Sequence, residues 1–577
     1  MASTTAISSG LSGMNANARS IDVIGNNVAN VNTTAFKSSR MMFSTATSHT
    51  TSEGTAPSDT SGGSNPFQVG QGVTIAGTQR NMSEGVPIST GDGRDLAIEG
   101  AGFFVLRKGE DSLYARAGAF RPDADNQLAA VSGERLQGYG VDSNYNIVPG
   151  SLTDIAVPVG KLKVAAATTI ARFSGNLNSN GSLPTQGSLV TLGSTAALGL
   201  RTVSAAAPAL STRLIDIEDP SLPASGTPLF ASGQSLQMRN AEKGGKALPT
   251  AAMTINATTT VQDLNTFLTQ SLGIDSSVGA NPDGRTPGAM LDPQTGLLSI
   301  VGNTGGVSDL DIDSNDLRLL TSTGDMVRAP FVATKLADAD GESVRTTFAA
   351  FDSLGAEVAI DVSMVMDGKD STGTRWRYYA ESADDSDITT QLATGTIRFD
   401  TDGRPTTTAL APITIDRGGT GAASPLGIDL DFAQAVSGLT SLASEKSELS
   451  ATFRDGAPLG TLGGFTVGTD GIITGSFSNG LTRTLGQVAL ATFTNPEGLA
   501  EAGGSMFNIT PASGIAVTTA PGSFGSGELL SGALEGSNVD LGEEFTKMIL
   551  ASTGYSASSR VIRTADELLQ QLLVLGR

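Results

Sequence analysis

Hydrophobic side chains recur at alternating spacings of four and three residues near both ends of this 577-residue chain. Such a repeat is typical of helices that pack along one face, as in coiled coils. It predicts one helix over residues 3 to 35 and another over residues 541 to 575. The apolar positions of the first are Ile7, Leu11, Met14, Ala18, Ile21, Ile24, Val28 and Val31. The stripe of the second, interrupted by Ser552 and Ser559, consists of Leu541, Phe545, Met548, Tyr555, Ile562, Ala565, Leu569 and Leu572.

The second helix carries a start signal, and both helices carry weak spots. Asp540 can cap the second helix, with Glu543 at the capping-box spacing. Gly542 and Gly554 each weaken it by about 1 kcal/mol relative to alanine. The first helix is nearly uncharged, and its end, Gly25 to Asn32, is rich in asparagine. We therefore expect the two stripes to pair and to be buried between subunits, although burial in an ordinary core is the alternative.

The sequence between the helices predicts short strands and turns. Residues 38 to 75 are rich in Ser, Thr and Gly and taken alone indicate a linker. Glu99 to Gly102 is predicted to form a tight turn between two strands. The alternation from Val358 to Met366, followed by Asp367-Gly368 and the segment around Trp376, predicts a hairpin with Met and Trp on its apolar face.

Two further segments of the middle region stand out. Thr466 to Ile473 contains a turn signal at Asp470-Gly471. Residues 181 to 330 differ in composition, with stretches rich in Pro, Ala and Ser and one helical pattern from Val261 to Leu272. This segment is predicted to be an inserted domain. The expected fold is therefore a mainly β multidomain protein with paired N- and C-terminal α-helices and nested domain insertions.

Composition narrows the possible partners. The formal charge of -21 and the pI near 4.5 argue against nucleic acid or an anionic membrane surface. No run of apolar residues is long enough for membrane insertion. The first ten residues, MASTTAISSG, lack the basic and apolar regions of a cleaved secretory signal, so any export is expected to proceed without one.

Residues suited to catalysis or metal binding are sparse. The chain has no cysteine, and its one histidine, His49, lies in a Ser/Thr-rich stretch. The Gly-Gly-Lys sequence at 244–246 lacks the spacing of a phosphate loop. The acidic run at 309–313 lacks the Gly and Glu of a calcium loop, and 338–341 and 400–403 are better explained as β-turns. We expect no catalytic, cofactor or metal site and no enzyme activity, although the 57 acidic residues leave paired carboxylates open.

Several motifs resemble one protein family. Gly25 to Lys37 (GNNVANVNTTAFK) is similar to the N-terminal signature of the bacterial flagellar axial proteins, the rod, hook and hook-associated set. The usual pattern has Gly before Phe-Lys, where this chain has Ala35, and this change could shift the backbone after the helix. Further resemblance lies in 100–106, 114–120, 136–139, 351–355, 486–499, 532–541 and 561–575. The positions matching the family motifs are Asn26, Asn27, Asn30, Phe36, Lys37, Gly102, Phe103, Phe104, Gly138, Tyr139, Asn538 and Asp540.

The resemblance implies a mechanical function. The long middle region and the FDSLG sequence at 351–355 favour the hook branch of the family, whose subunits polymerise into a flexible, curved, hollow tube that transmits torque from rod to filament. The implied partners are further copies in a homopolymer, the distal rod, hook cap and hook–filament junction proteins, and the flagellar export apparatus. The implied location is extracellular, in the flagellum, with no nucleic acid partner and no membrane insertion.

Pairing the two ends implies a nested order of domains. These are a terminal helical domain (1–37 and 536–577), a connecting segment (38–75), a β domain (76–165 and 447–535), a second β domain (166–180 and 331–446) and an inserted outer domain (181–330). Three alternatives remain: another axial protein, such as a distal rod or hook-associated junction protein, a secreted β-rich adhesin, or a depolymerase acting on acidic surfaces. An adhesin would not need paired terminal helices, and an enzyme would need a clustered site.

Overall fold

The computed structural model describes residues 2–575 apart from 196–197, 223, 407–409 and 434–437. The chain forms two compact units. The first contains Met1–Lys163 and Thr461–Arg577, and the second contains Val164–Gly460. The first unit therefore combines both ends of the chain, as the terminal repeats predicted.

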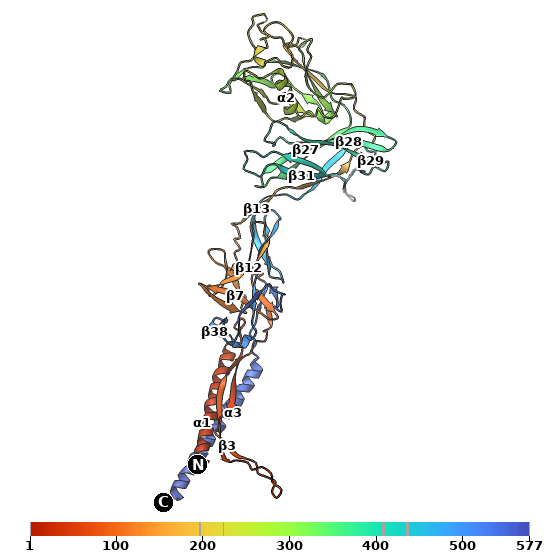
Figure 1. The fold of residues 1–577 in the computed structure, drawn as a ribbon. Coiled ribbons are helices and arrows are strands. Elements are labelled where there is room, and N and C mark those ends of the chain that lie inside the picture. Colours follow the sequence, from red (N-terminus) through yellow and green to blue (C-terminus); the bar gives the residue numbers. More distant parts are fainter. Residues whose placement is uncertain (1, 196–197, 223, 407–409, 434–437, 576–577) are drawn as a thin grey trace. The chain divides into compact units, whose positions relative to one another are not determined.

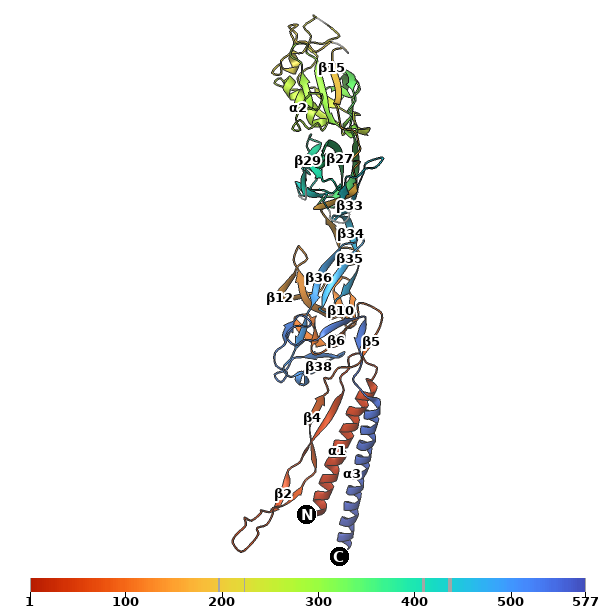
Figure 2. The same ribbon diagram turned by 90° about the vertical axis from the view of Figure 1, so that its right-hand side faces the viewer.

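Two long helices form one end of the first unit. Helix α1 spans Ala2–Ala29 and helix α3 spans Leu541–Leu575, and they lie side by side with opposite directions (Figures 1 and 2). The prediction that α1 continues to residue 35 is wrong: the helix ends at Ala29, and Val31 lies in the following turn. The cause is the run Gly25 to Asn32, whose asparagines compete for backbone hydrogen bonds. None of the described helices is long and apolar enough to cross a membrane.

Residues 38–75, for which composition indicated a linker, form paired strands at both ends of the segment. Strand β1 (Ser39–Thr45) pairs with β4 (Val73–Arg80), and β2 (Ser48–Ser52) pairs with β3 (Phe67–Gly70), giving a long antiparallel hairpin. The hairpin contacts α1, where the backbone N–H of Val73 donates to Oγ of Ser12 at 3.2 Å. Most of its side chains are exposed, so no alternation of apolar residues marks its strands.

The rest of the first unit is a β domain. Its main sheet follows the order β34-β35-β36-β11-β7-β8-β39-β38. Its strands are β7 (Phe103–Lys108), β8 (Asp111–Ala115), β11 (Arg135–Val141), β34 (Ala457–Val467), β35 (Ile472–Phe477), β36 (Thr482–Val488), β38 (Ala500–Gly503) and β39 (Met506–Asn508). Branches are formed by β9 (Phe120–Pro122), β10 (Leu128–Ala130), β12 (Ile147–Asp154), β37 (Leu490–Thr492) and β40 (Val517–Thr519). The turn predicted at Asp470-Gly471 is confirmed between β34 and β35.

Two strand pairs connect this domain to the helices. Strand β5 (Pro87–Ser89) pairs with β42 (Ala533–Glu535), and β6 (Leu96–Glu99) pairs with β41 (Glu528–Ser531). The turn predicted over Glu99 to Gly102 therefore joins two strands that each pair elsewhere, because β7 pairs with β8. A turn signal between strands did not reveal which partners the strands take.

The second unit begins with two facing sheets. One has the order β30 (Ala411–Ile415), β31 (Leu426–Asp431), β14 (Ile170–Asn176) and β32 (Leu439–Thr440), with β33 (Glu448–Arg454) also paired to β14. The other has the order β26 (Ser343–Phe351), β27 (Glu357–Asp370), β28 (Gly373–Glu381) and β29 (Gln391–Phe399). The predicted hairpin is confirmed as β27–β28, with Met364, Met366 and Trp376 fully buried. Its turn lies at 371–372 rather than at Asp367-Gly368, where the register instead shifts.

The predicted inserted segment has its own hydrophobic core and helix. Helix α2 (Val261–Ser271) forms where the helical pattern indicated, and it begins with a complete capping box between Thr260 and Asp263. One sheet contains β20 (Gly288–Leu291), β21 (Leu298–Thr304), β15 (Gly187–Gly193) and β25 (Val332–Ala337). The others contain β19 (Ala251–Thr254), β16 (Ser235–Met238), β23 (Leu317–Leu320) and β24 (Met326–Arg328), and β18 (Lys246–Ala247), β17 (Glu242–Lys243) and β22 (Leu310–Asp311).

The strand pairs differ from the proposed domain limits at more than one place. The boundary placed at residue 330 assigned β25 to the second β domain, whereas β25 pairs with β15 of the inserted segment. The boundary placed at residue 75 divides β4, which pairs with β1 along its whole length. The boundary placed at residue 447 assigned Glu448–Arg454 to the first β domain, whereas β33 pairs with β14 in the second unit. The remaining limits between nested domains stay predictions.

Candidate functional site

The antiparallel helix pair is held close by small residues. A Cβ atom placed on Gly10 would lie 2.7 Å from Cγ1 of Ile562, and one placed on Gly13 would lie 2.9 Å from Oγ of Ser558. Similarly, a Cβ on Gly554 would lie 2.9 Å from the amide group of Asn17. The glycines predicted to weaken α3 thus include one that permits close approach of the helices.

The side chains that α3 buries differ in part from the predicted stripe. Its most buried side chains are Glu544, Ala551 and Ala565, and small residues occupy much of the contact with α1. Because these contacts involve small residues, the pattern of large apolar residues does not mark them. The buried positions of α3 therefore differ from the predicted stripe. Of the predicted positions, Ala565 is buried, Met548, Ile562 and Leu569 are half-buried, and Leu541, Phe545 and Tyr555 are exposed. The side chain of Leu572 lies outside the described residues.

The predicted positions of α1 are distributed similarly. Ile24 is buried, and Leu11 is exposed. The half-buried positions are Ile7, Met14, Ala18, Ile21 and Val28, together with Val31 beyond the helix end. Whether these residues contact other subunits stays a prediction.

Helix α3 carries a large apolar surface that this chain does not cover. Phe545 is 51% exposed, and Ile549 and Leu550 are each 67% exposed. Further along the same helix, other large apolar side chains are exposed: Tyr555, Val561, Leu568, Leu573 and Val574. Single exposed apolar residues are ordinary on a monomer, but a series along one helix marks an interaction surface.

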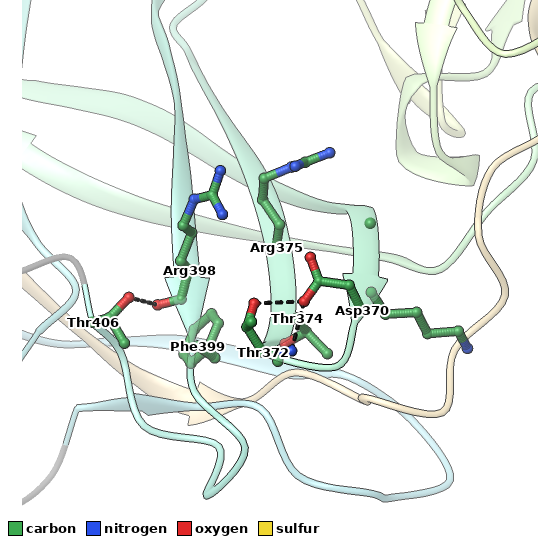
Figure 3. A pocket seen from close by; sticks show the side chains of 10 residues that line it. Asp370, Thr372, Thr374, Arg375, Arg398, Phe399 and Thr406 are labelled. Carbon is green, nitrogen blue, oxygen red and sulfur yellow. Dashed lines mark hydrogen bonds between the residues drawn. The ribbon is translucent and has the colours of Figure 1, made fainter.

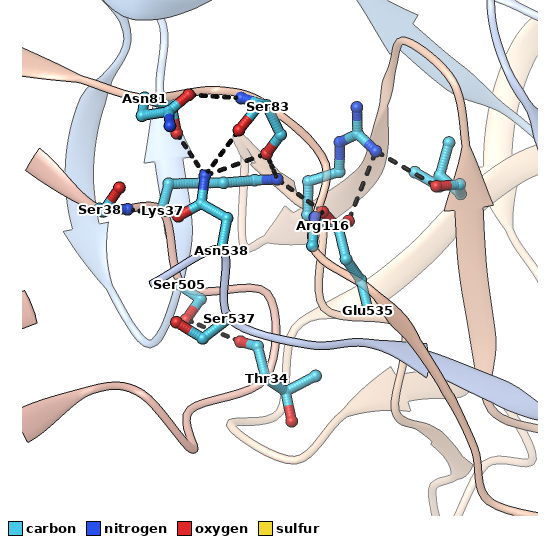
Figure 4. Close-up of polar contacts among 12 residues, drawn as sticks. Thr34, Lys37, Ser38, Asn81, Ser83, Arg116, Ser505, Glu535, Ser537 and Asn538 are labelled. Carbon is cyan, nitrogen blue, oxygen red and sulfur yellow. Dashed lines mark hydrogen bonds and ion pairs between the residues drawn. The ribbon is translucent and has the colours of Figure 1, made fainter. Parts of the chain in front are cut away.

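A buried ionic group lies where the helices meet the β domain (Figure 4). Lys37, Arg116 and Glu535, here called the junction cluster, bring together segments far apart in the chain. Nζ of Lys37 donates to Oε1 of Glu535 at 2.5 Å, and both side chains are only 1% exposed. Burial lowers the pKa of Lys37, and attraction to the Glu535 carboxylate only partly offsets this effect.

Other contacts complete the junction cluster. Lys37 also donates to the carbonyl of Ser83 at 2.6 Å, and the N–H of Gly85 donates to Glu535 at 2.9 Å. Arg116 lies 3.4 Å from the other carboxylate oxygen of Glu535 and donates to the carbonyl of Gly100 at 2.7 Å. The group is thus densely hydrogen-bonded, as a buried charge requires.

Asparagines from the family motifs fasten the ends of both helices. Nδ2 of Asn27 donates to the carbonyl of Ser39 at 2.8 Å and to the carboxylate of Glu544 at 3.0 Å, which joins α1, β1 and α3. Oδ1 of Asn538 accepts from the N–H of Ser38 at 2.8 Å. Asp540 caps α3 by accepting from the backbone of the first helical turn, as predicted, at 2.8 and 3.2 Å.

The remaining motif residues serve other parts of the first unit. Asn26 and Asn30 bond each other at the end of α1, and Phe36 is half-buried. Phe103 and Phe104 are buried in the β domain, and Gly102 has a positive φ of 132°. Gly138 is required where β11 and β36 meet, since a Cβ atom there would lie 2.2 Å from the carbonyl of Gln487. Tyr139 is half-buried on β11.

Ala35 occupies a backbone conformation that favours glycine. Its φ is 55°, its side chain is fully buried, and its N–H donates to the carbonyl of Glu535 at 2.8 Å. The chain therefore forms a left-handed turn with Ala at a position where glycine is less strained. A backbone shift relative to the family pattern stays a prediction.

A cavity of about 300 Å³ lies at the end of the β27–β28 hairpin and is lined by several charged side chains (Figure 3). The carboxylate of Asp370 accepts from the N–H and Oγ1 of Thr372, and these hydrogen bonds lower its pKa. Lys369 donates to the carbonyl of Gly181 at 3.1 Å, and Arg375 donates to Asp367 at 2.5 Å. These charges stabilise the hairpin end. Within the described residues, no group of three or more His, Cys, Asp or Glu could hold a metal ion.

Comparisons with known proteins agree at both ends and in the middle of the chain. Residues 7–37 match the Flagella basal body rod protein family, and residues 530–575 match the Flagellar basal body rod FlgEFG protein C-terminal family. Residues 97–172 match the Flagellar hook protein FlgE/F/G D1 domain, and residues 319–457 match the Flagellar basal body protein FlaE D2 domain.

Several relatives that match over their full length carry the same name. The chain is 29% identical to Flagellar hook protein FlgE of Caulobacter vibrioides, covering 100% of both chains. It is 28% identical to that of Borreliella burgdorferi, covering 98% of both, and 26% identical to that of Escherichia coli, covering 99% and 100%. The chain belongs to the flagellar hook protein family. A crystal structure of Helicobacter pylori flagellar hook protein FlgE2 has 16% identity and a TM-score of 0.36, covering 77% of this chain and 98% of that one.

For this hook-family chain, sequence reasoning missed the acidic partners of the motif residues. Glu535 lies inside the matched segment 532–541, and Glu544 lies in the first turn of α3. Arg116 lies inside the matched segment 114–120. The available signal was one Lys in the N-terminal motif and one Glu in the C-terminal motif. Opposite charges in two motifs do not by themselves show that the side chains lie within contact distance.

Proposed function

We propose that this hook-family chain polymerises through the helix pair α1–α3. The chain is a structural subunit of the bacterial flagellar hook. The observation that carries the interface assignment is the row of large exposed apolar side chains on α3, with Ile549 and Leu550 each 67% exposed. Burial of a Leu or Ile side chain contributes about 1.5–3 kcal/mol, so a few such residues per neighbour supply substantial association energy.

The predicted stripe and the uncovered surface divide the helix pair into two kinds of contact. Small residues such as Gly10 and Gly554 hold α1 against α3 within a subunit, and Phe545, Ile549 and Leu550 are left for neighbouring copies. We propose that exposed Leu11 on α1 and exposed Leu541 and Tyr555 on α3 belong to the same intersubunit surface.

The nested order of domains supports a layered tube. In this proposal the terminal helices line the channel, the β domain of the first unit forms the surrounding wall, and residues 181–330 lie outermost. The tube is flexible and curved and transmits torque from rod to filament. Proposed partners are further copies, the distal rod, the hook cap, the hook–filament junction proteins and the export apparatus. The proposed location is extracellular, and no enzyme activity is proposed.

Polymerisation of purified variants tests the interface. The double variant Ile549→Ser/Leu550→Ser should abolish tube formation at concentrations where the unchanged chain polymerises, as measured by sedimentation and electron microscopy. Val131→Ser is the matched control, because Val131 is 89% exposed on the same unit but lies away from the helices. Far-UV circular dichroism establishes that both variants fold. Equal polymerisation by a folded double variant would refute the assignment of α3.

A further inference from the structure

The inserted segment is joined to the rest of the second unit by two neighbouring stretches of chain. Oδ1 of Asp340 accepts from the N–H of Thr185 at 2.6 Å and of Gln186 at 2.9 Å, so the outgoing and returning stretches are tied together. The N–H of Glu342 donates to the carbonyl of Ser182 at 2.9 Å. A domain held only by such a neck could swivel about it, so its orientation depends on contacts beyond the neck.

Two lysines of the inserted segment contact acidic residues of the β26–β29 sheet. Lys243, on β17, donates to the carboxylate of Glu381 on β28 and to the carbonyl of Gly273 at 2.6 Å. Lys243 and Glu381 are both buried. Lys246, on β18, lies 2.5 Å from the carboxylate of Asp361 on β27 and is more exposed.

An arginine of the sheet makes the reciprocal contact. Nη1 of Arg345, on β26, donates to the carbonyl of Lys243 at 2.9 Å, and Nη2 donates to the carbonyl of Val307. The N–H of Val307 also donates to Oγ of Ser343 at 3.2 Å. Charged groups therefore reach across the contact in both directions, which restricts sliding in the plane of the sheet.

Two glycines of the inserted segment lie close to side chains of the other part around these charges. A Cβ atom on Gly305 would lie 2.7 Å from the side chain of Val365 on β27, and one on Gly273 would lie 2.7 Å from Oγ1 of Thr390. Both glycines also have positive φ, at 95° and 60°. These glycines therefore allow the two parts to approach closely beside the ion pairs.

We propose that Lys243, Lys246, Arg345, Asp361 and Glu381 form an electrostatic clamp that holds the inserted segment and the β26–β29 sheet as one rigid body. The buried Lys243–Glu381 pair resists salt, because it is shielded from solvent ions. The more exposed Lys246–Asp361 pair is weakened by salt. Loss of Glu381 leaves the charge of Lys243 buried without its partner, so the contact opens.

Distances between spin labels test the clamp in the full-length chain. Because the natural sequence has no cysteine, labels attach only at introduced sites. Thr266→Cys on α2 and Thr396→Cys on β29 place exposed labels on the two parts. Thr266→Cys with Ser322→Cys places both labels within the inserted segment and reports whether that segment stays folded. The distances are measured by pulsed electron–electron double resonance.

Charge variants give opposite expectations for the clamp and for a simple neck. The unchanged clamp should give one narrow distance distribution between parts, and Glu381→Gln with Asp361→Asn should widen it at least about twofold. Asp361→Lys alone should widen it, and Lys246→Glu with Asp361→Lys should restore it. Glu357→Gln, on an exposed residue of the same strand, should change nothing.

The outcomes separate clearly. A broad distribution in the unchanged chain, or a narrow one in the folded Glu381→Gln/Asp361→Asn variant, would overturn the proposal. If the distance between the two labels inside the inserted segment changes in that variant, the segment has not kept its fold. The comparison of Lys246→Glu/Asp361→Lys with Asp361→Lys then tests the clamp. Failure of Lys246→Glu/Asp361→Lys to narrow the distribution below that of Asp361→Lys then counts against the clamp.

Discussion

Replacing Glu535 by glutamine should strongly destabilise the first unit. The carboxylate accepts a hydrogen bond from Lys37, accepts another from the N–H of Gly85 and lies 3.4 Å from Arg116. Glutamine keeps the shape and can keep one acceptor, but it removes the negative charge. The ammonium of Lys37, on a side chain only 1% exposed, then stays buried beside a second cation.

The expected loss follows from the cost of an unpaired buried charge. Removing one partner of a buried ion pair typically costs about 3–5 kcal/mol, whereas the intact pair itself contributes little beyond a well-packed apolar replacement. At a urea m value near 3 kcal/mol/M, a loss of about 4 kcal/mol lowers the unfolding midpoint by roughly 1.3 M. Adding Lys37→Met to Glu535→Gln should recover part of the lost free energy of unfolding. We expect a coupling energy of about 1–3 kcal/mol between the two changes.

Urea unfolding of the monomer, followed by circular dichroism at the helix band, measures this loss. The signal is dominated by α1 and α3, which have 28 and 35 residues and are fastened at the junction cluster. Glu528→Gln is the matched control, since Glu528 is exposed on the neighbouring strand β41. The reasoning would be refuted if Glu535→Gln and the control unfolded at the same urea concentration. A coupling energy of zero between Glu535→Gln and Lys37→Met would also refute it.

Three further changes have defined outcomes. Ala35→Gly should be neutral or stabilising by up to about 1 kcal/mol, because relief of left-handed strain offsets the lost buried methyl. The same change at buried Ala16 inside α1 should cost more than about 1 kcal/mol in the same urea assay. Asp540→Ala should lose about 1 kcal/mol through its cap on α3, whereas Asp540→Asn should retain most of it; equal losses would contradict capping. Burial raises the pKa of Asp340 and Asp455, but hydrogen bonds from backbone and threonine groups outweigh it and hold both pKa values below the ordinary 3.8. Their contribution to stability is present above pH 3.8 and is lost as the pH falls below it. The single tryptophan is buried in the second unit, so its fluorescence should report acid unfolding in that pH range. Substituting both aspartates by asparagine should flatten this pH dependence of stability.

Much of the architecture followed from local patterns. The terminal repeats predicted α1 and α3, the alternation before Trp376 predicted β27–β28, and Val261 to Leu272 marked α2. These features depend on periodicity and capping within one element, which a sequence displays directly. The end of α1 was misplaced because the asparagine run was treated as fraying rather than as termination.

The candidate site was predictable only in part. Asn27, Asn538 and Asp540 were found through the family motifs, but their partners were not. Several positions of the predicted apolar stripe on α3 are exposed, because the contacts with α1 at Gly554 and Ser558 depend on small size rather than on hydrophobicity. The hairpin over residues 39–80 was missed because its stability comes from backbone pairing and contact with α1, neither of which requires apolar alternation.

The junction cluster also determines when the terminal helices can fold. Lys37 and Glu535 are separated by 498 residues, so closing that loop in an otherwise unfolded chain would cost roughly 5–6 kcal/mol in entropy. The contact therefore forms late, after the intervening domains have shortened the loop. A chain truncated before Glu535 should fold its second unit yet leave α1 unfolded. Ordering of the helices is thus conditional on synthesis and delivery of the whole chain, which keeps incomplete subunits from presenting a polymerisation surface.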